Sequence, residues 1–176
     1  TDQERRWSWI PDFGERLPGR QWLRDHGTEF TRYYTNSVPC SPSRATLFTG
    51  LHVSEHGVRD NVLSKHHRTL DHSIPTLGHR MREAGYRTAY VGKWHLDYGS
   101  TPDMEAYGFG DWSGDDWRYM GFPLTGMDVD QELAGKAIGW LRDEGAVEKR
   151  PWFLVISLVN PHDIVYYPVD QDWYQE

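Results

Sequence analysis

One uninterrupted apolar run limits what this chain can fold into more than any other feature. Residues Trp152 to Val159 (WFLVISLV) include a single polar side chain, that of Ser157. A run of this length predicts a strand buried on both faces, which is typical of parallel sheets covered by helices. A second strand is predicted over Tyr86 to Val91, after a helical segment that Gly85 ends. The sequence therefore predicts an α/β fold with a mostly parallel central sheet flanked by helices.

Three segments carry a helical pattern. Helices are predicted over Leu17 to His26, over Ser73 to Ala84 with Ser73 as its cap, and over Asp128 to Asp143. The last of these has one apolar face, made of Val129, Leu133, Ala137, Trp140 and Leu141.

Two further segments complete the expected organisation. β-Branched and aromatic residues predict a strand over Thr28 to Thr35 that leads towards Cys40. The segment from Tyr98 to Gly126 is rich in Gly, Asp and Trp, and it is predicted to be a long loop or insertion that shapes substrate access or only covers the surface.

Composition excludes several classes of partner. The 176 residues suffice for one domain with a real core. A net charge of −7 without a basic block argues against nucleic acid. The chain has no apolar run of about 18 residues, so no membrane span is expected, and its first residues do not resemble a signal peptide. A single cysteine excludes a disulfide within the chain, and the composition fits a bacterial cytoplasm or periplasm equally well.

The lone cysteine stands where a helix is expected to begin. In Cys40-Ser-Pro-Ser-Arg44, Pro42 suits the first helical position, and Ser41 or Ser43 can cap the free amides of the first turn. Backbone N–H groups and the helix dipole favour an anion there, and Arg44 adds a permanent positive charge. The segment is therefore predicted to bind a tetrahedral oxyanion.

Simpler interpretations of Cys40 also exist. A single cysteine is most often a small buried apolar residue. A phosphatase-type thiolate loop needs a wider spacing than the four positions between Cys40 and Arg44, and no local pattern pairs Cys40 with a histidine as in cysteine proteases.

The longer stretch closely resembles the signature of the type I sulfatases, a family with an alkaline-phosphatase-like fold. Cys40, Pro42 and Arg44 match its core, and the apolar run that follows matches through Leu47, Thr49 and Gly50. In that family a maturation enzyme oxidises the cysteine to formylglycine, an aldehyde that hydrates to a gem-diol. The resemblance implies that Cys40 is the source of the nucleophile, that Arg44 polarises it, and that the maturation enzyme is a partner.

Two polar motifs follow the two predicted strands, where ligands of parallel sheets bind. Gly92-Lys93-Trp94-His95 resembles the Gly-Lys-x-His motif of sulfatases, which implies that Lys93 binds the sulfate and that His95 moves a proton. Asn160-Pro161-His162-Asp163 resembles the family segment whose histidine contacts the sulfate and protonates the leaving oxygen, a role that falls on His162. Without the family context, Lys93 and His95 would be surface residues and His162 a turn residue.

The metal and one substrate contact rest on the resemblance. Asp2 and Gln3 match the acidic opening that binds a divalent cation in the family, together with the group derived from Cys40. Oxygen ligands favour Ca²⁺, with Mg²⁺ or Mn²⁺ as alternatives. Asn61 matches a substrate-binding asparagine of some members, although it is equally an ordinary turn residue. His52 and His56, four residues apart, are assigned no role.

The resemblance covers nearly all of residues 1–176, yet it corresponds only to the N-terminal portion of a sulfatase catalytic domain. The first strand and the later metal-binding and substrate-binding segments are expected to be absent, so the sheet is expected to be incomplete. The predicted function is hydrolysis of a small-molecule or saccharide sulfate ester. The alternatives are a phosphonate monoester or phosphodiester hydrolase of the same superfamily, and an inactive fragment or non-catalytic relative.

Overall fold

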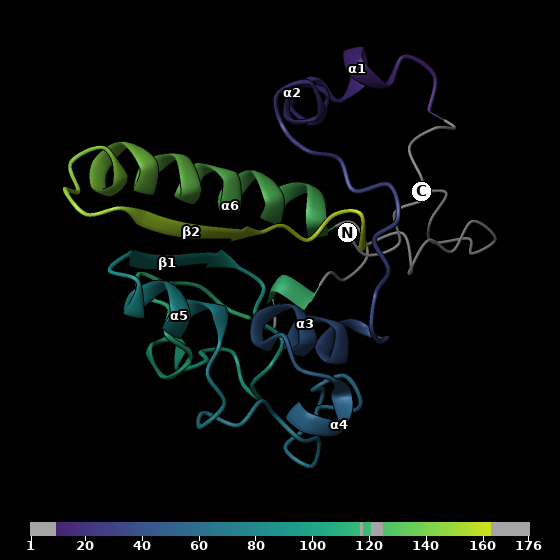
Figure 1. The fold of residues 1–176 in the computed structure, drawn as a ribbon, viewed down its shortest axis with the longest axis vertical. Coiled ribbons are helices and arrows are strands. Elements are labelled where there is room, and N and C mark those ends of the chain that lie inside the picture. The colour runs from purple at the N-terminus through teal and green to yellow at the C-terminus, as the bar shows by residue number, and fades with distance from the viewer. Residues whose placement is uncertain (1–9, 117, 121–124, 163–176) are drawn as a thin grey trace.

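Two parallel strands form the centre of the fold. The computed structural model describes residues 10–116, 118–120 and 125–162 (Figure 1). Strand β1 (Arg87–Gly92) pairs with β2 (Trp152–Ser157), with Arg87 opposite Trp152 and Gly92 opposite Ser157. The predicted parallel pairing and the α/β fold class are therefore confirmed.

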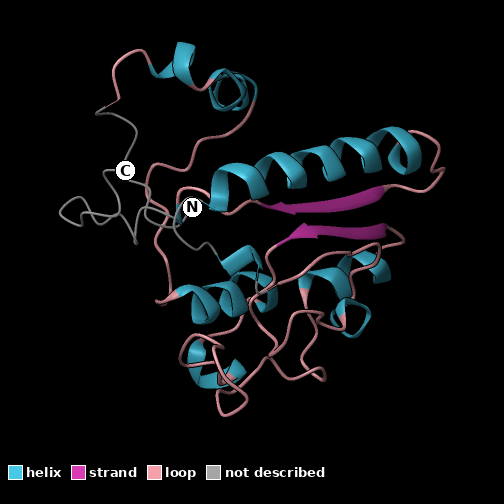
Figure 2. Cartoon of the chain, turned by 180° about the vertical axis from the view of Figure 1, so that it is seen from behind, coloured by secondary structure: helices cyan, strands magenta, loops and turns pink. Residues whose placement is uncertain are grey.

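Helices cover both faces of this strand pair, because side chains alternate between the two faces along each strand. Helix α6 (Thr125–Trp140) runs along one side, and α3 (Cys40–Thr49) and α5 (Leu77–Glu83) lie on the other, as Figures 1 and 2 show from opposite directions. Val91 and Leu154 pack towards α6, where they meet Val129 and Leu133. The opposite face is covered by the larger of the two cores.

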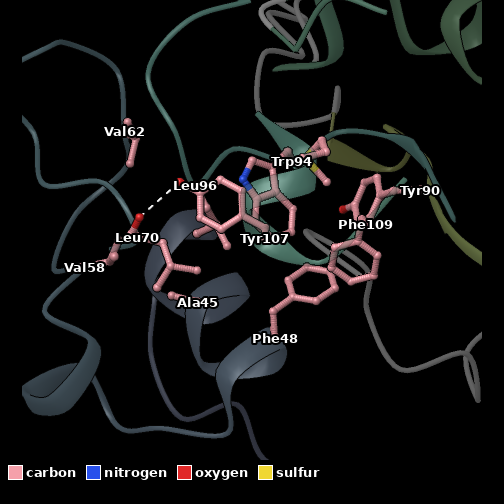
Figure 3. Packing of buried hydrophobic residues seen from close by; sticks show 11 residues of the cluster. Ala45, Phe48, Val58, Val62, Leu70, Tyr90, Trp94, Leu96, Tyr107 and Phe109 are labelled. Atoms are coloured by element: carbon pink, nitrogen blue, oxygen red, sulfur yellow. Dashed lines mark hydrogen bonds between the residues drawn. The ribbon is translucent and has the colours of Figure 1, made fainter. Parts of the chain in front are cut away.

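The larger core joins α3 to the carboxyl end of β1. Its members come from α3, β1 and the segments after them, and eleven buried side chains form it (Figure 3). The ring of Phe48 lies 5.0 Å from that of Trp94, and the ring of Tyr90 lies 5.2 Å from that of Phe109. Such tilted and edge-on aromatic pairs fix the relative orientation of the elements that carry them. The N-terminus of α3 is thereby held beside the strand ends.

The predicted helices are found with shifted boundaries. Helix α2 (Pro18–His26) follows a short α1 (Phe13–Arg16), and α4 (Val53–His56) is a single turn. Helix α5 begins four residues later than predicted, because its cap is Thr76, whose Oγ1 accepts the N–H of Gly78 at 3.1 Å, and not Ser73. Helix α6 starts earlier than predicted and passes into a π turn, Leu141–Gly145. Leu141 was predicted to lie on the apolar face of this helix, but its side chain is exposed.

Two strand predictions were wrong. Residues Thr28 to Thr35 form no strand, and the side chains of Phe30 and Tyr34 are 76% and 82% exposed. Strand β2 exists but is not buried on both faces, since Ile156 is 46% exposed. Among the described residues only β1 lies beside β2, so its outer edge has no neighbouring strand to bury it.

The segment from Tyr98 to Gly126 differs from a surface loop. Its described residues include two short 3-10 helices, Met104–Tyr107 and Arg118–Met120, and contribute Met104, Tyr107 and Phe109 to the larger core. Gly110 forms a parallel bridge with Ala89, on the side of β1 opposite β2. The segment therefore acts as part of the scaffold. In the described part of the chain, every helix is too short or too polar to span a bilayer.

His56 is one of the two histidines without an assigned role. Its environment predicts that the free energy of unfolding depends on pH. Its buried ring accepts the N–H of Val58 at Nδ1 (3.1 Å), and its Nε2 lies 3.2 Å from Oγ1 of Thr46. Burial lowers the pKa of His56 below 6.5, against a smaller opposing effect of Glu55. The unfolded chain therefore takes up a proton first as the pH falls below 6.5.

We expect the stability that His56 contributes to be fully present above pH 6.5 and to be lost as the pH falls through its folded pKa. The urea midpoint of the wild-type protein should consequently fall more between about pH 7.5 and about pH 5.5 than that of a His56→Gln variant. Equal losses in both proteins would contradict this assignment.

Candidate active site

Cys40 is the first residue of α3, which confirms its predicted place at a helix N-terminus, and it is half-buried. The helix is not capped by serine, contrary to the prediction from the sequence. Pro39 occupies the cap position without a side-chain bond, and Pro42 stands at the third helical position. The carboxamide Oδ1 of Asn61 accepts the N–H of Ser41 at 3.0 Å. Asn61 thus satisfies one of the amides that a helix N-terminus leaves open. Its predicted contact with substrate stays a prediction.

Ser41 links three segments beside Cys40. Its side chain is fully buried, donates to the carbonyl oxygen of His95 at 2.6 Å and accepts the N–H of Val62 at 3.1 Å. A hydroxyl that is satisfied in both directions holds the turn at Cys40 directly against the turn at His95, although 54 residues separate Ser41 from His95.

Arg44 clamps the strand ends. Its Nε donates to the carbonyl oxygen of Trp94 at 2.7 Å, and its Nη2 donates to the carbonyl oxygen of Lys93 and to the hydroxyls of Tyr90 (2.6 Å) and Ser157 (3.1 Å). Burial raises the pKa of Tyr90, so its hydroxyl keeps a proton and donates to the carbonyl of Lys93 at 2.6 Å. The guanidinium therefore ties α3, β1 and β2 together, and its predicted role towards substrate stays a prediction.

The Lys93–His95 turn is buried and tightly constrained. Lys93 is 5% and His95 2% exposed, so neither is a surface residue. Gly92 has a φ of 102°, and a Cβ at this position would overlap the carbonyl oxygen of Ser157. His95 has a φ of 58°, a left-handed conformation that non-glycine residues rarely adopt. Such backbone strain persists only where surrounding contacts enforce it.

Asp116 supplies those contacts. Its two carboxylate oxygens accept consecutive backbone N–H groups, those of Trp94 at 2.6 Å and of His95 at 2.8 Å, and its side chain is fully buried. Burial raises the pKa of Asp116, while the two N–H donors, Arg44 and Lys93 act in the opposite direction. Burying the charged carboxylate therefore lowers the stability of the fold, and its presence here indicates a role in holding this turn.

A second aspartate holds the turn after β2 in the same way. The carboxylate of Asp130, from α6, accepts the N–H of Val159 at 2.6 Å and of Asn160 at 2.9 Å. The N–H of His162 then donates to the carbonyl oxygen of Val159 at 3.0 Å. Each predicted histidine therefore follows a strand and stands on a turn that an aspartate fixes.

Several predicted residues lie outside this geometry. Asp2, Gln3 and Asp163 fall outside the described residues. Within the described residues, no group of three His, Cys, Asp or Glu side chains could hold a metal ion. The Nδ1 of His52 lies 2.7 Å from the Nδ2 of Asn36, and the Nε2 of His56 lies 3.2 Å from Oγ1 of Thr46.

Sequence reasoning missed the residues that support the site: Ser41 as a cross-link, Tyr90, Asp116, Asp130 and Ser157. One signal was available, because Asp130 stands three positions before Leu133 and seven before Ala137, on the apolar face of a predicted helix. A polar residue on such a face indicates a buried partner. Asp116 lies in an irregular segment that carries no comparable pattern.

Comparison with known proteins gives matches over most of the chain. A family model described as Sulfatase matches residues 14–175. The chain is 31% identical over 180 residues to a choline-sulfatase of Rhizobium meliloti, covering 83% of this chain and 33% of the relative. It is 32% identical over 162 residues to arylsulfatase K of Bos taurus, covering 84% and 28%. The chain thus spans a third or less of the length of these relatives.

Two solved structures are similar at the level of the fold and 25% sequence identity. One is a 2-O GAG sulfatase, with a TM-score of 0.59 over 80% of this chain and 29% of that chain. The other is the phosphonate monoester hydrolase of Agrobacterium radiobacter, with a TM-score of 0.57 over 82% and 36%.

Proposed function

The chain belongs to the sulfatase family, and from this premise we propose that its protein hydrolyses sulfate monoesters with a formylglycine formed from Cys40. One observation carries the proposal. The hydrogen bonds from Ser41 and Arg44 to the carbonyls of residues 93–95 bring the cysteine motif and the Lys-x-His motif side by side. A nucleophile, a cation and a proton carrier on adjoining turns would form the set that covalent ester hydrolysis requires.

The proposed reaction has two steps, a displacement at sulfur and an elimination. One hydroxyl of the hydrated aldehyde at residue 40 loses its proton to solvent, and its oxygen attacks sulfur, which forms an O–S bond and breaks the S–O bond to the alcohol, while His162 gives the alcohol its proton. Lys93 neutralises the sulfate oxygens. His95 then removes the proton of the second hydroxyl, the aldehyde C=O forms again, and the C–O bond to sulfate breaks.

The proposal includes a bound divalent cation, but no step of the reaction above is assigned to it. Asp2, Gln3 and the group at residue 40 are the proposed ligands, with Ca²⁺ preferred and Mg²⁺ or Mn²⁺ as alternatives. Bound there, the cation would add positive charge beside the nucleophile.

The second candidate function is hydrolysis of phosphonate monoesters or phosphodiesters with the same nucleophile. The likeness to the phosphonate monoester hydrolase supports it, as does the position of Asn61 one hydrogen bond from the cysteine turn. Parallel assays with an aryl sulfate and an aryl phosphonate monoester distinguish the two candidates.

The modification itself gives the sharpest test. We expect the tryptic peptide that carries Cys40, from protein made together with a formylglycine-generating enzyme, to lose about 18 Da as the thiol becomes an aldehyde. The same peptide from a Cys40→Ser variant serves as the control and should keep the mass of serine. An unmodified thiol, under conditions that convert a known sulfatase, would favour a non-catalytic relative.

A further inference from the structure

A basic cavity lies in the loop between α4 and α5, outside the site described above. Its volume is about 380 Å³, and the residues that line it are Gly57, Arg59, Asp60, His66, His67 and Arg68. Four of these six carry a basic side chain and one carries a carboxylate. The local charge is therefore opposite to the net charge of −7 of the whole chain.

The cavity is shaped around the guanidinium of Arg68. A Cβ on Gly57 would lie 2.6 Å from Cζ and 2.7 Å from Nε of Arg68, so the guanidinium occupies space that only glycine leaves open. Gly57 also has a φ of 74°, a conformation that favours glycine. The absent side chain of Gly57 thus leaves room for the Arg68 guanidinium at the cavity wall.

The carboxylates of this region are already engaged. Oδ1 of Asp60 accepts the N–H of Asn61 at 2.7 Å. Oδ1 of Asp71 accepts both the N–H and the hydroxyl of Ser73, and the positive charge of Arg68 also acts on this carboxylate. Within the described residues, neither Arg59 nor Arg68 has an ion-pair partner. In the described part of the chain, the donors of both guanidinium groups therefore remain for a ligand.

His67 adds a directed donor. Its Nδ1 accepts the N–H of Leu63 at 3.1 Å, so the neutral ring carries its proton on Nε2. His66 is exposed beside it. Planar guanidinium groups with nearby imidazoles suit an oxyanion, which accepts two parallel hydrogen bonds from each arginine.

The cavity is connected to the candidate active site through the chain. Arg59 and Asp60 directly precede Asn61, whose Oδ1 accepts the N–H of Ser41, the neighbour of Cys40. We propose that this cavity is an anion subsite that binds a second acidic group, sulfate or carboxylate, of the same substrate molecule. Its assignment to the substrate rests on the proposed function, whereas the binding of an oxyanion does not.

The test is a titration of the whole chain followed through the imidazole signals of its histidines by NMR. The probes are sodium sulfate and sodium acetate, with chloride keeping the ionic strength constant because surface charges are screened by salt. We expect saturable shifts of His66 and His67. In an Arg59→Ala/Arg68→Ala variant the apparent Kd for sulfate should rise about tenfold or more. A response to sulfate alone identifies a tetrahedral dianion, and a response to both probes includes carboxylates.

Lys65→Ala is the matched control, because Lys65 belongs to the same loop and has the same charge but does not line the cavity. It should leave the shifts of His66 and His67 unchanged. Equal loss in the control, or equal shifts at the distant His26, would overturn the subsite. Shifts at His95 and His162 alone would also overturn it while leaving the proposed function intact, and shifts at His66 and His67 alone would support the subsite without the proposed function.

Discussion

An Arg44→Ala variant is expected to lose about 3–5 kcal/mol of unfolding free energy, because two buried carbonyls and two hydroxyls lose a charged donor at once. Trp94 and Tyr90 are fully buried, so water does not easily replace the guanidinium. Such a loss is a large share of the roughly 5–15 kcal/mol that typical domains possess. Urea unfolding followed by tryptophan fluorescence measures it.

An Arg44→Lys variant keeps this prediction testable if the alanine variant does not fold. A single ammonium cannot occupy the positions of both Nε and Nη2, so we expect roughly half of the loss. Arg142→Ala is the control, since Arg142 is an exposed residue and its removal should change stability by at most about 0.5 kcal/mol. A loss below about 1 kcal/mol for Arg44→Ala would contradict the clamp.

We expect substitutions of Asp116 to change two properties that are measured separately: the free energy of unfolding and the order of the Lys93–His95 turn. Asp116→Ala leaves two buried N–H groups without an acceptor and should cost about 2–4 kcal/mol. Asp116→Asn keeps one acceptor and removes the buried charge. Hydrogen exchange at the amides of Trp94 and His95 should accelerate in both variants, because at least one of the two bonds is lost.

The pH dependence of the asparagine variant follows from the raised pKa of Asp116. The folded state holds the proton more firmly than the unfolded state, so the stability that this carboxyl contributes is present below about pH 3.8 and is lost as the pH rises through the folded pKa. Asp116→Asn avoids that loss. Its stability relative to the wild type should therefore increase from acidic to neutral pH.

Asp130→Ala provides the matched comparison for Asp116. It removes the same kind of paired contact at the other turn, so exchange should accelerate at Val159 and Asn160 and remain unchanged at Trp94 and His95. Identical effects of the two substitutions on both turns would show general unfolding in place of local positioning. A fall in the stability of Asp116→Asn relative to the wild type at higher pH would contradict the cost assigned to the buried charge.

The local elements could be predicted from the sequence because each is encoded in a few neighbouring residues. The apolar run at Trp152 and the segment after Gly85 became the paired strands β2 and β1, and the apolar face of α6 is buried through Val129, Leu133 and Ala137. Strand ends of a parallel pair point the same way, so the polar residues after them were expected at one edge.

Predictions that depended on contacts with an element elsewhere in the chain were wrong more often. The strand expected over Thr28 to Thr35 is absent, and β2 is half-exposed, because a strand forms and is buried only beside a neighbour that supplies hydrogen bonds and cover. The serine cap of α3 was wrong for a related reason. Asn61, which is distant in sequence, satisfies Ser41 instead, and the serine hydroxyl is used for a long-range link.

The sequence by itself therefore determined which residues are the candidates for the chemistry: a cysteine at a helix start, a lysine and a histidine after one strand, and a histidine after another. Only the tertiary structure decided what holds them. Arg44, Asp116 and Asp130 bind backbone groups that lie 21 to 50 residues away along the chain. Such contacts leave no periodic pattern, because the packing of helices on the strand pair sets which distant carbonyls and amides come within reach of a buried charge.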